Sequence, residues 1–403
     1  MTLELASSRV DSLELRYLNG TFAELCRIAS PSGSERACAD RVIAELRALE
    51  VSVEEDDAGP RAGSDCGNLL ARIPASTRSQ EAESSDAAAA PARSVLLCAH
   101  LDTVPLLAPV EPVLLDGYWQ NSNEGVLGAD NKAAIAVVLA LARHIRREGA
   151  ALDVELLFTV GEETSLAGAR AFDASRLHSD FGFVFDHASP IGEIVVDSPT
   201  HFRVEADFHG AAAHAGIRPE LGRSAIVAAA RAISTLATGR IDEQTTLNVG
   251  TIAGGSAINV VPERCSFLAE VRSLDEQRAE AVVTELVERI HAAANLPECE
   301  CDVDVSVQRT FSGFHLPATR PAVRVAEAAL RECGYEPVRI ASGGASDANE
   351  LIAQGRDVVN LANGTEKNHE PDERVSAEAL ERMLDVALAL LDAASGSAAD
   401  AAR

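Results

Sequence analysis

Four short runs of consecutive apolar residues are the most regular feature of the chain. They occupy residues 95–99, 154–160, 181–185 and 358–361. Continuous apolar runs of this length are typical of parallel strands that are buried on both faces of a sheet. Helical periodicity fills residues 131–147 and 322–334, between some of these runs. The pattern therefore predicts an α/β fold, with a mostly parallel sheet and helices on both faces.

The pattern changes between residues 200 and 307, where apolar and polar positions alternate. One alternating segment runs from Phe202 to Phe208, and a period of two indicates a strand with one solvated face. Two helical stretches, 222–238 and 275–294, lie among these segments. The order strand, helix, strand, strand, helix, strand predicts an inserted α+β domain of the ferredoxin-like kind.

This insertion divides the chain into three predicted parts. We expect a catalytic domain built from residues 1–197 and 308–403, with a lid and dimerisation domain at 198–307 between the two segments. The stretch 75–94, rich in Ala, Ser and Glu, is expected to be an exposed loop between two neighbouring strands. The similar composition of residues 394–403 predicts a disordered tail.

The amino-acid composition disfavours several classes of binding partner and cellular location. The chain has 403 residues with 62 acidic and 35 basic side chains, which gives a formal charge of −27. This acidity disfavours binding to nucleic acid or to an anionic membrane, because both need basic patches. The chain has no apolar run of about 18 residues to span a membrane, and its first residues do not resemble a signal peptide. The eight cysteines form no C-x-x-C pair, so we expect reduced thiols in a cytoplasmic protein.

Acidic and imidazole side chains follow three of the four predicted strands. They are His100, Asp102, Glu162, Glu163 and Asp186. Ligands of open α/β sheets bind beyond the carboxyl ends of the strands, so these side chains are expected to converge. Asp130, at the start of a predicted helix, and His369, after the fourth strand, are expected to join them. Taken singly, such residues have plainer interpretations, for example an N-cap for Asp130 or a turn residue for Asp102.

So many carboxylates in one crevice cannot all stay ionised without cations nearby. Mixed imidazole and carboxylate ligands suit Zn²⁺, and also Co²⁺ or Mn²⁺. One bridging carboxylate with two further ligands for each ion would make a two-metal site. A coordinated water loses a proton easily, and a nearby free carboxylate can accept it. The combination of residues therefore favours a metal-dependent hydrolase.

Five short motifs follow one another along the chain. They are His100-Leu-Asp102-Thr-Val-Pro105, Leu127-Gly-Ala-Asp130-Asn131-Lys132, Gly161-Glu162-Glu163, Phe185-Asp186 and Asn368-His369-Glu-Pro. In this order and at these separations they resemble the M20 metallopeptidase family, with a match from about residue 22 to residue 390. The segments 128–133 and 342–349 look most like its peptidase T-like, tripeptidase branch.

The resemblance implies a ligand set for two divalent metal ions, with zinc as the first choice and cobalt or manganese as alternatives. His100 and Asp186 would bind one ion. Glu163 and His369 would bind the other, and Asp130 would bridge the two. The resemblance also implies a cis peptide bond directly after this bridging residue.

Further residues would act beside these ligands. Asp102 would hydrogen-bond the ring of His100 and fix its tautomer. Glu162 would be the general base for attack by a metal-bridging hydroxide. In the lid, His214 would stabilise the oxyanion, often in the active site of the partner subunit. The positions implied to bind substrate are Asn259, Arg272, Ser346, Asp347 and Asn349.

The resemblance implies a two-metal peptidase that hydrolyses the amide bonds of small peptides and releases the N-terminal residue of tripeptides. A homodimer through the lid domain is the expected assembly. One alternative shares the fold and the chemistry, namely an N-acyl-amino-acid amidohydrolase or a carboxypeptidase-like enzyme. Another is a catalytically silent binding protein, which is disfavoured because all five implied ligands and Glu162 are intact.

Overall fold

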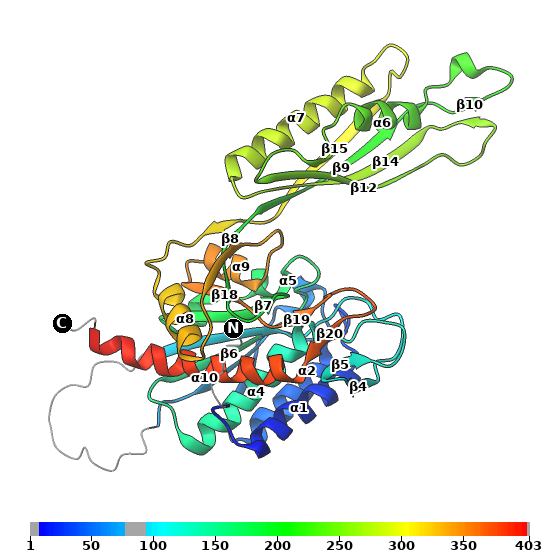
Figure 1. Cartoon of the computed structure of the whole chain (residues 1–403). Coiled ribbons are helices and arrows are strands. Elements are labelled where there is room, and N and C mark those ends of the chain that lie inside the picture. Colours follow the sequence, from blue (N-terminus) through cyan, green and yellow to red (C-terminus); the bar gives the residue numbers. More distant parts are fainter. Residues whose placement is uncertain (1–7, 77–93, 401–403) are drawn as a thin grey trace. The chain divides into compact units, whose positions relative to one another are not determined.

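The computed structural model describes residues 8–76 and 94–400, and it contains two compact units (Figure 1). The larger unit consists of Met1–Val196, Leu316–Ala341 and Ser346–Arg403. The inserted unit consists of Asp197–His315 and the short segment Ser342–Ala345. Each unit has its own sheet and its own helices.

The centre of the larger unit is a sheet whose four middle strands are parallel. In spatial order they are β6 (Asp153–Thr159), β3 (Ser94–His100), β7 (Phe181–His187) and β18 (Val358–Ala362). Nearly all of their side chains are buried. They coincide with the four apolar runs of the sequence, so the prediction of buried parallel strands is confirmed. Because they are parallel and adjacent, their carboxyl ends lie at one edge of the sheet.

The outer strands add antiparallel pairs on both sides of the parallel centre. β2 (Leu69–Ile73) pairs antiparallel with β6, and β1 (Val53–Glu55) pairs antiparallel with β2. On the other side, β8 (Glu193–Ser198) pairs antiparallel with β18, and β17 (Val338–Ala341) pairs with β8. Strands β1 and β17 are partly exposed, so they lack the continuous apolar pattern that reveals the central strands.

The stretch rich in Ala, Ser and Glu connects β2 to β3, but these two strands are not neighbours. β6 lies between them in the sheet, so the expectation of a loop between neighbouring strands is wrong. The reason is that β6, which comes later in the chain, pairs with both strands, and such an insertion leaves no local signal in the sequence. Residues 77–93 of the stretch lie outside the described residues.

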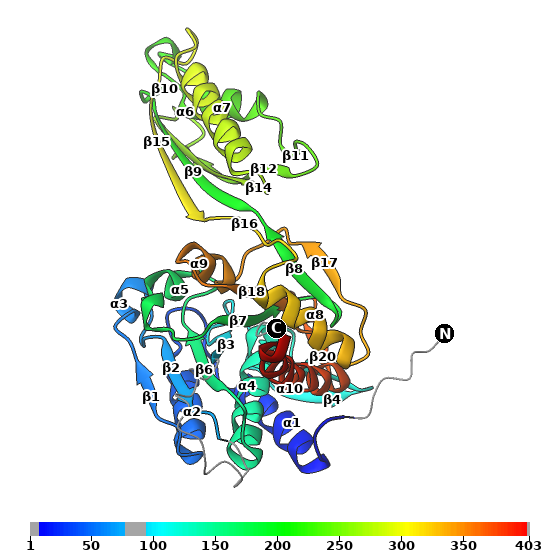
Figure 2. The same cartoon turned by 90° about the vertical axis from the view of Figure 1, so that its left-hand side faces the viewer.

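Helices cover both faces of this sheet. Figure 2 shows α4 (Ala129–Glu148) and α10 (Ala377–Asp400) on one side, with α5 (Ala167–Ala171) and α9 (Asp347–Ala353) on the other. Small and apolar side chains fill most of α4, which is buried along most of its length against β3 and β7. The remaining helices of the unit are α1 (Ser12–Arg27), α2 (Arg36–Ala48), α3 (Gly59–Ala62), α8 (Pro321–Glu332) and the 3₁₀ turn Ala174–Arg176.

The C-terminal helix differs from the expectation of a disordered tail from residue 394. α10 continues to Asp400, and residues 401–403 lie outside the described residues. The tail is rich in Ala, which has the highest helix propensity, and this explains how a low-complexity stretch can continue a helix. In the described parts of the chain, no helix is both long and apolar enough to cross a membrane.

A second, smaller sheet carries the loop that contains His369. Its order is β19 (Thr365–Glu366), β20 (Arg374–Ser376), β5 (Tyr118–Asn121) and β4 (Pro112–Leu115), and all its pairs are antiparallel. His369 lies in the turn between β19 and β20. The hairpin is therefore fixed to the rest of the unit through its pairing with β5.

The inserted unit is an antiparallel sheet with two helices on its apolar face. Its main strands lie in the order β12 (Thr245–Gly254), β14 (Arg264–Ser273), β9 (Thr200–His209) and β15 (Asp302–Phe311). α6 (Ala225–Ser234) and α7 (Glu276–Ala294) pack on them in one core. The order along the chain confirms the predicted ferredoxin-like arrangement. The shorter elements are β10 (Ala213–His214), the 3₁₀ turn Pro219–Leu221, β11 (Gly239–Arg240), β13 (Val260–Val261) and β16 (Phe314–His315).

Candidate metal centre

The implied ligands meet at the carboxyl edge of the parallel strands, inside the larger unit. His100 is the last residue of β3, and Asp186 is the last but one of β7. Glu163 lies in the turn that follows β6, and Asp130 lies at the start of α4. The β19–β20 hairpin adds His369. Adjacent parallel strands thus bring together residues that are far apart in the sequence.

The carboxylate of Asp130 is the centre of the cluster, because its two oxygens face different partners. Oδ1 lies 3.1 Å from Nε2 of His100, and Oδ2 lies 3.3 Å from Nε2 of His369. Asp186 Oδ1 lies 3.7 Å from Nε2 of His100, and Glu163 Oε1 lies 2.8 Å from Nε2 of His369. Each half of the cluster therefore offers three ligand atoms within 4.8 Å of one another, and Asp130 belongs to both halves.

The electrostatics of the cluster favour added positive charge. Burial raises the pKa of Asp186 well above its ordinary value, and the neighbouring Asp130 raises it further. Hydrogen bonds to Asp130 and Glu163 raise the pKa of His369 to about 10. The carboxylates therefore repel one another and draw protons to the site. Divalent ions fit this donor set, because they bring the balancing charge and accept mixed imidazole and carboxylate ligands.

Asp102 contacts both the ring of His100 and the loop that follows β6. Nδ1 of His100 lies 3.1 Å from the carbonyl oxygen of Asp102 and 3.3 Å from its Oδ1. Both acceptors are oxygens, so Nδ1 carries the proton and Nε2 is left for a metal ion. The same carboxylate accepts the backbone N–H groups of Glu162 at 3.0 Å and Glu163 at 3.1 Å. One side chain thus fixes groups from two different strands relative to each other.

Glu162 lies beside the ligand atoms. One of its carboxylate oxygens is within 4.8 Å of ligand atoms of His100 and Glu163. Burial, followed by the charge of Asp186, raises the pKa of Glu162 well above its ordinary value. A carboxyl group with a raised pKa beside a metal centre is suited to accept and return a proton.

Two residues that the sequence analysis missed hold the loops on which the ligands lie. The buried Glu35 accepts the N–H of Gly161 at 3.2 Å, directly before the two glutamates. Asn360, on β18, accepts the N–H of Asp186 and donates to its carbonyl, both at 2.9 Å. In the sequence, an acid in a turn and an amide in a strand look like ordinary polar residues. Only tertiary packing shows that they are buried against the site.

Two further missed residues act on Asp130. Glu373 accepts its backbone N–H at 2.9 Å, and Asn368 donates from Nδ2 to its Oδ2 at 2.9 Å. Both lie close to His369 in the same hairpin. The peptide bond between Asp130 and Asn131 is cis, as the resemblance implies.

The implied substrate contacts at the start of α9 are buried in the structure. Ser346 and Asp347 are each 1% exposed, and Asn349 is 2% exposed. Oδ1 of Asn349 accepts the N–H of Ser346 at 3.1 Å, and Asp347 accepts the hydroxyl of Thr159. These contacts build the first turn of α9 and tie it to β6. A role of the three residues in substrate binding stays a prediction.

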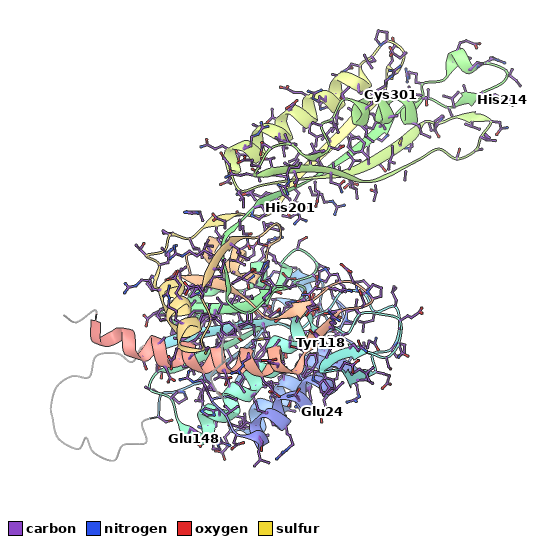
Figure 3. All side chains as sticks on the ribbon, in the orientation of Figure 1. Glu24, Tyr118, Glu148, His201, His214 and Cys301 are labelled. Atoms are coloured by element: carbon purple, nitrogen blue, oxygen red, sulfur yellow. The ribbon has the colours of Figure 1, made fainter. Side chains whose placement is uncertain are left out.

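The other implied substrate contacts lie at two opposite ends of the inserted unit. His214 and Asn259 are exposed, and their loops are joined by a backbone hydrogen bond and by the pairing of β10 with β13. Arg272 lies at the far end of β14, opposite His201 in the register, and donates to the carbonyl of Gly343 at 3.0 Å. Figure 3 labels His214 and His201, which mark these two ends.

Imidazole and carboxylate groups gathered beyond parallel strands are what metal-dependent hydrolases use to bind cations and activate water. By its fold and its donor set, the protein falls in this class. Comparison with protein families agrees with the class. Residues 82–195 match the model of Peptidase family M28, and residues 200–295 match the Peptidase dimerisation domain of M20 enzymes.

Similar proteins define the family more closely. The uncharacterized protein YqjE of Bacillus subtilis is 32% identical to this chain, over 93% of the chain and 97% of its own length. The structure of aminopeptidase PepT from Bacillus cereus is 33% identical, covers 94% of this chain and 98% of its own, and has a TM-score of 0.82. A tripeptidase structure from Staphylococcus aureus is 30% identical with the same coverage and a TM-score of 0.86. The chain therefore belongs to the M20 family of metallopeptidases, in the peptidase T-like branch.

Proposed function

We propose that this protein is a two-metal peptidase that releases the N-terminal residue of tripeptides. The observation that carries the proposal is the carboxylate of Asp130, whose two oxygens face two different imidazoles. A carboxylate in this arrangement can belong to two ligand sets at once. The similarity to structures named as an aminopeptidase and a tripeptidase supports the substrate class.

The ligand sets follow from the two halves of the cluster. His100 and Asp186 would hold one ion, Glu163 and His369 would hold the other, and Asp130 would be common to both. The donors suit zinc, with cobalt and manganese as alternatives. When bound, the ions would polarise the scissile carbonyl and lower the pKa of water. The YXEP protein of Bacillus subtilis, named as a dinuclear metal binding peptidase of the M20 family, shares the fold at 18% identity.

Glu162 is the proposed general base and general acid. Its carboxylate would accept a proton from the attacking water and later donate it to the amine of the leaving peptide. The raised pKa of Glu162, caused first by burial, suits a group that must hold this proton between two steps. Its backbone N–H donates to Asp102 at 3.0 Å, which keeps it in register with His100.

We also propose roles for residues of the inserted unit, and these roles imply that the protein is a homodimer. His214 would donate to the oxyanion, while Asn259 and Arg272 would bind the carboxylate end of the substrate. β14 is 10 residues long, or roughly 30 Å at about 3.3 Å per residue, so the two ends of one inserted unit cannot both contact one small peptide. A homodimer in which the partner's His214 and the partner's Asn259 complete the site resolves this difficulty, because both residues lie at the end opposite Arg272. The match to the Peptidase dimerisation domain supports such an assembly.

A second candidate function uses the same chemistry but removes residues from the C-terminal end of the peptide. A protein of Paracoccidioides brasiliensis that is named as a probable carboxypeptidase is 27% identical over 70% of this chain. A carboxypeptidase would release the C-terminal residue, and an acylase of the same fold would remove an N-acyl group. An aminopeptidase requires a free N-terminal amine on the substrate, and the other two activities do not.

The experiment that tests the proposal compares free, N-acetylated and C-amidated forms of one tripeptide, together with the matching N-acetyl amino acid. We expect release of the N-terminal residue from the free and C-amidated peptides, and little cleavage after N-acetylation. Faster cleavage of the N-acetylated peptide at its last bond would support the carboxypeptidase instead. Bound metal without turnover of any substrate in the set would support the catalytically silent binding protein.

A further inference from the structure

A buried carboxylate outside the ligand set lies against Asp130. Glu373 is 2% exposed and lies in the hairpin between β19 and β20, together with His369. Its Oε1 accepts the N–H of Asp130 at 2.9 Å, and its Oε2 accepts the N–H of Gly128 at 2.6 Å. Both oxygens are thus used on the backbone at the start of α4.

The contacts of Glu373 do more than cap the start of α4, because they also fix the backbone next to Asp130. A neutral Ser or Asn can cap a helix without the cost of burying a charge. Glu373 instead uses both carboxyl oxygens on backbone N–H groups, and such hydrogen bonds are roughly twice as strong as neutral ones when the carboxyl group is ionised. Their donors, Gly128 and Asp130, flank Ala129, so the backbone is fixed on both sides of one residue. Gly128 has a φ of +76°, and an added Cβ would lie 3.1 Å from the Thr103 side chain, so this turn has little freedom to change.

The fixed backbone in turn determines the orientation of the Asp130 side chain. A carboxylate that must face His100 with one oxygen and His369 with the other tolerates little rotation of its backbone. Glu373 holds the Asp130 N–H, while Asn368 donates to its Oδ2 at 2.9 Å. Both holding residues come from the hairpin that also carries His369, so the position of the carboxylate is coupled to that of the imidazole.

We infer that Glu373 is a positioning residue for the bridging carboxylate. Through its hydrogen bonds to Gly128 and Asp130 it sets the side chain of Asp130 so that both imidazoles reach it. This inference rests on the proposed function, because it takes the two halves of the cluster to be metal sites. The rival explanation is that Glu373 only caps α4, in which case its loss would lower stability and leave metal binding unchanged.

The test compares Glu373→Gln with a matched control, Glu155→Gln. Glu155 is also 2% exposed, and its carboxylate accepts the backbone N–H groups of His178 and Ser179, each at 2.8 Å. It lies near the start of β6, away from the carboxyl edge that holds the ligands. The readouts are the visible absorption spectrum of the Co²⁺-loaded protein and the Co²⁺ dissociation constant, obtained by competition with a chelator.

We expect Glu373→Gln to weaken Co²⁺ binding about 10–100-fold, the range known for residues that orient metal ligands, and to change the Co²⁺ spectrum. Glu155→Gln should keep the wild-type spectrum and affinity. Glu373→Asp keeps the charge but retracts the carboxylate by one methylene, so we expect it to behave like Glu373→Gln. It replaces that variant if Glu373→Gln does not fold.

Several results would overturn the inference. Wild-type spectrum and affinity in a folded Glu373 variant would show that Glu373 is only a cap. An equal change in Glu155→Gln would mean that the effect is one of general stability. In both cases the wild-type protein would still bind Co²⁺, and the proposed function would stand. A wild-type protein that binds no Co²⁺ would instead contradict the proposed metal centre itself.

Discussion

The two regions to which we assign chemistry are built in opposite ways. At the candidate metal centre of the larger unit, His100 is 1% exposed and Asp130 is 8% exposed, and buried side chains hold the loops around them. At the tip of the inserted unit, His214 and Asn259 are exposed, and backbone pairing between short strands holds their loops. The first region is preorganised within one unit, whereas the second keeps its polar groups in water.

This difference predicts which property a substitution in each region should change. Groups that are fixed in a dry site act strongly on charge that develops in the reaction, while a hydrated donor acts strongly only once it is covered. Substitutions at the candidate metal centre should therefore affect metal binding or the chemical step itself. Substitutions in the inserted unit should reduce turnover or substrate affinity and leave the metal ions in place.

The largest effect is expected from Glu162→Ala. Loss of the proposed general base should lower kcat by about 10²–10⁴-fold, the usual contribution of such a group, while metal content stays at the wild-type level. Steady-state kinetics and elemental analysis of the same preparation measure both quantities. The control is Glu336→Ala, at an exposed position of the larger unit. Retained turnover in Glu162→Ala would remove Glu162 from this role.

Asp102→Asn tests the residue that contacts both His100 and the loop after β6. An amide cannot accept from the ring of His100 and from two backbone N–H groups as the carboxylate does. We expect metal affinity to fall about 10–100-fold, together with turnover. Ser32→Ala removes one hydrogen bond of 2.7 Å to the same carboxylate and should have a smaller effect. An Asp102→Asn protein with unchanged metal affinity and kcat would contradict the assigned role.

His214→Ala is expected to lower kcat by about 10²–10³-fold, as the loss of one oxyanion donor does, with metal content unchanged. His209→Ala, in the same unit, is the control, because His209 pairs with Asp304. Co-expression of His214→Ala with Glu162→Ala should restore part of the activity, since a mixed dimer would contain one complete site. No recovery in verified mixed dimers would mean that His214 does not act across the interface.

Arg272→Ala should give the smallest effect of the series. If Arg272 binds the substrate carboxylate, KM should rise about tenfold, or roughly 1.4 kcal/mol of binding free energy, with little change in kcat. Arg278→Ala removes an exposed ion pair with Asp242 and serves as the control. An unchanged KM would leave Arg272 as the structural partner of Glu270, from which it lies 3.1 Å.

The parts of the molecule that could be predicted are those with a local signal. The four buried strands show as apolar runs, and four of the five implied ligands follow such a run closely or begin a helix, where a polar residue after an apolar run is visible. His369 lies farther from its strand, in the turn between β19 and β20. Glu373 follows Pro371 and Asp372 in a turn and looks like a solvated acid. Its role depends on burial against α4, which is set by the pairing of β20 with β5. The insertion of β6 between β2 and β3 could not be predicted from the sequence either, because it also depends on strand pairing between distant segments.

The central claim is that two ions share Asp130 and that turnover depends on them. The most direct test titrates the metal-free protein with Zn²⁺ and follows both binding and the cleavage of a tripeptide. Our account predicts that binding saturates at two ions per chain, that activity rises with this binding, and that Asp130→Ala loses both. Full activity in the presence of a strong chelator, or a folded protein that binds no Zn²⁺, would contradict it.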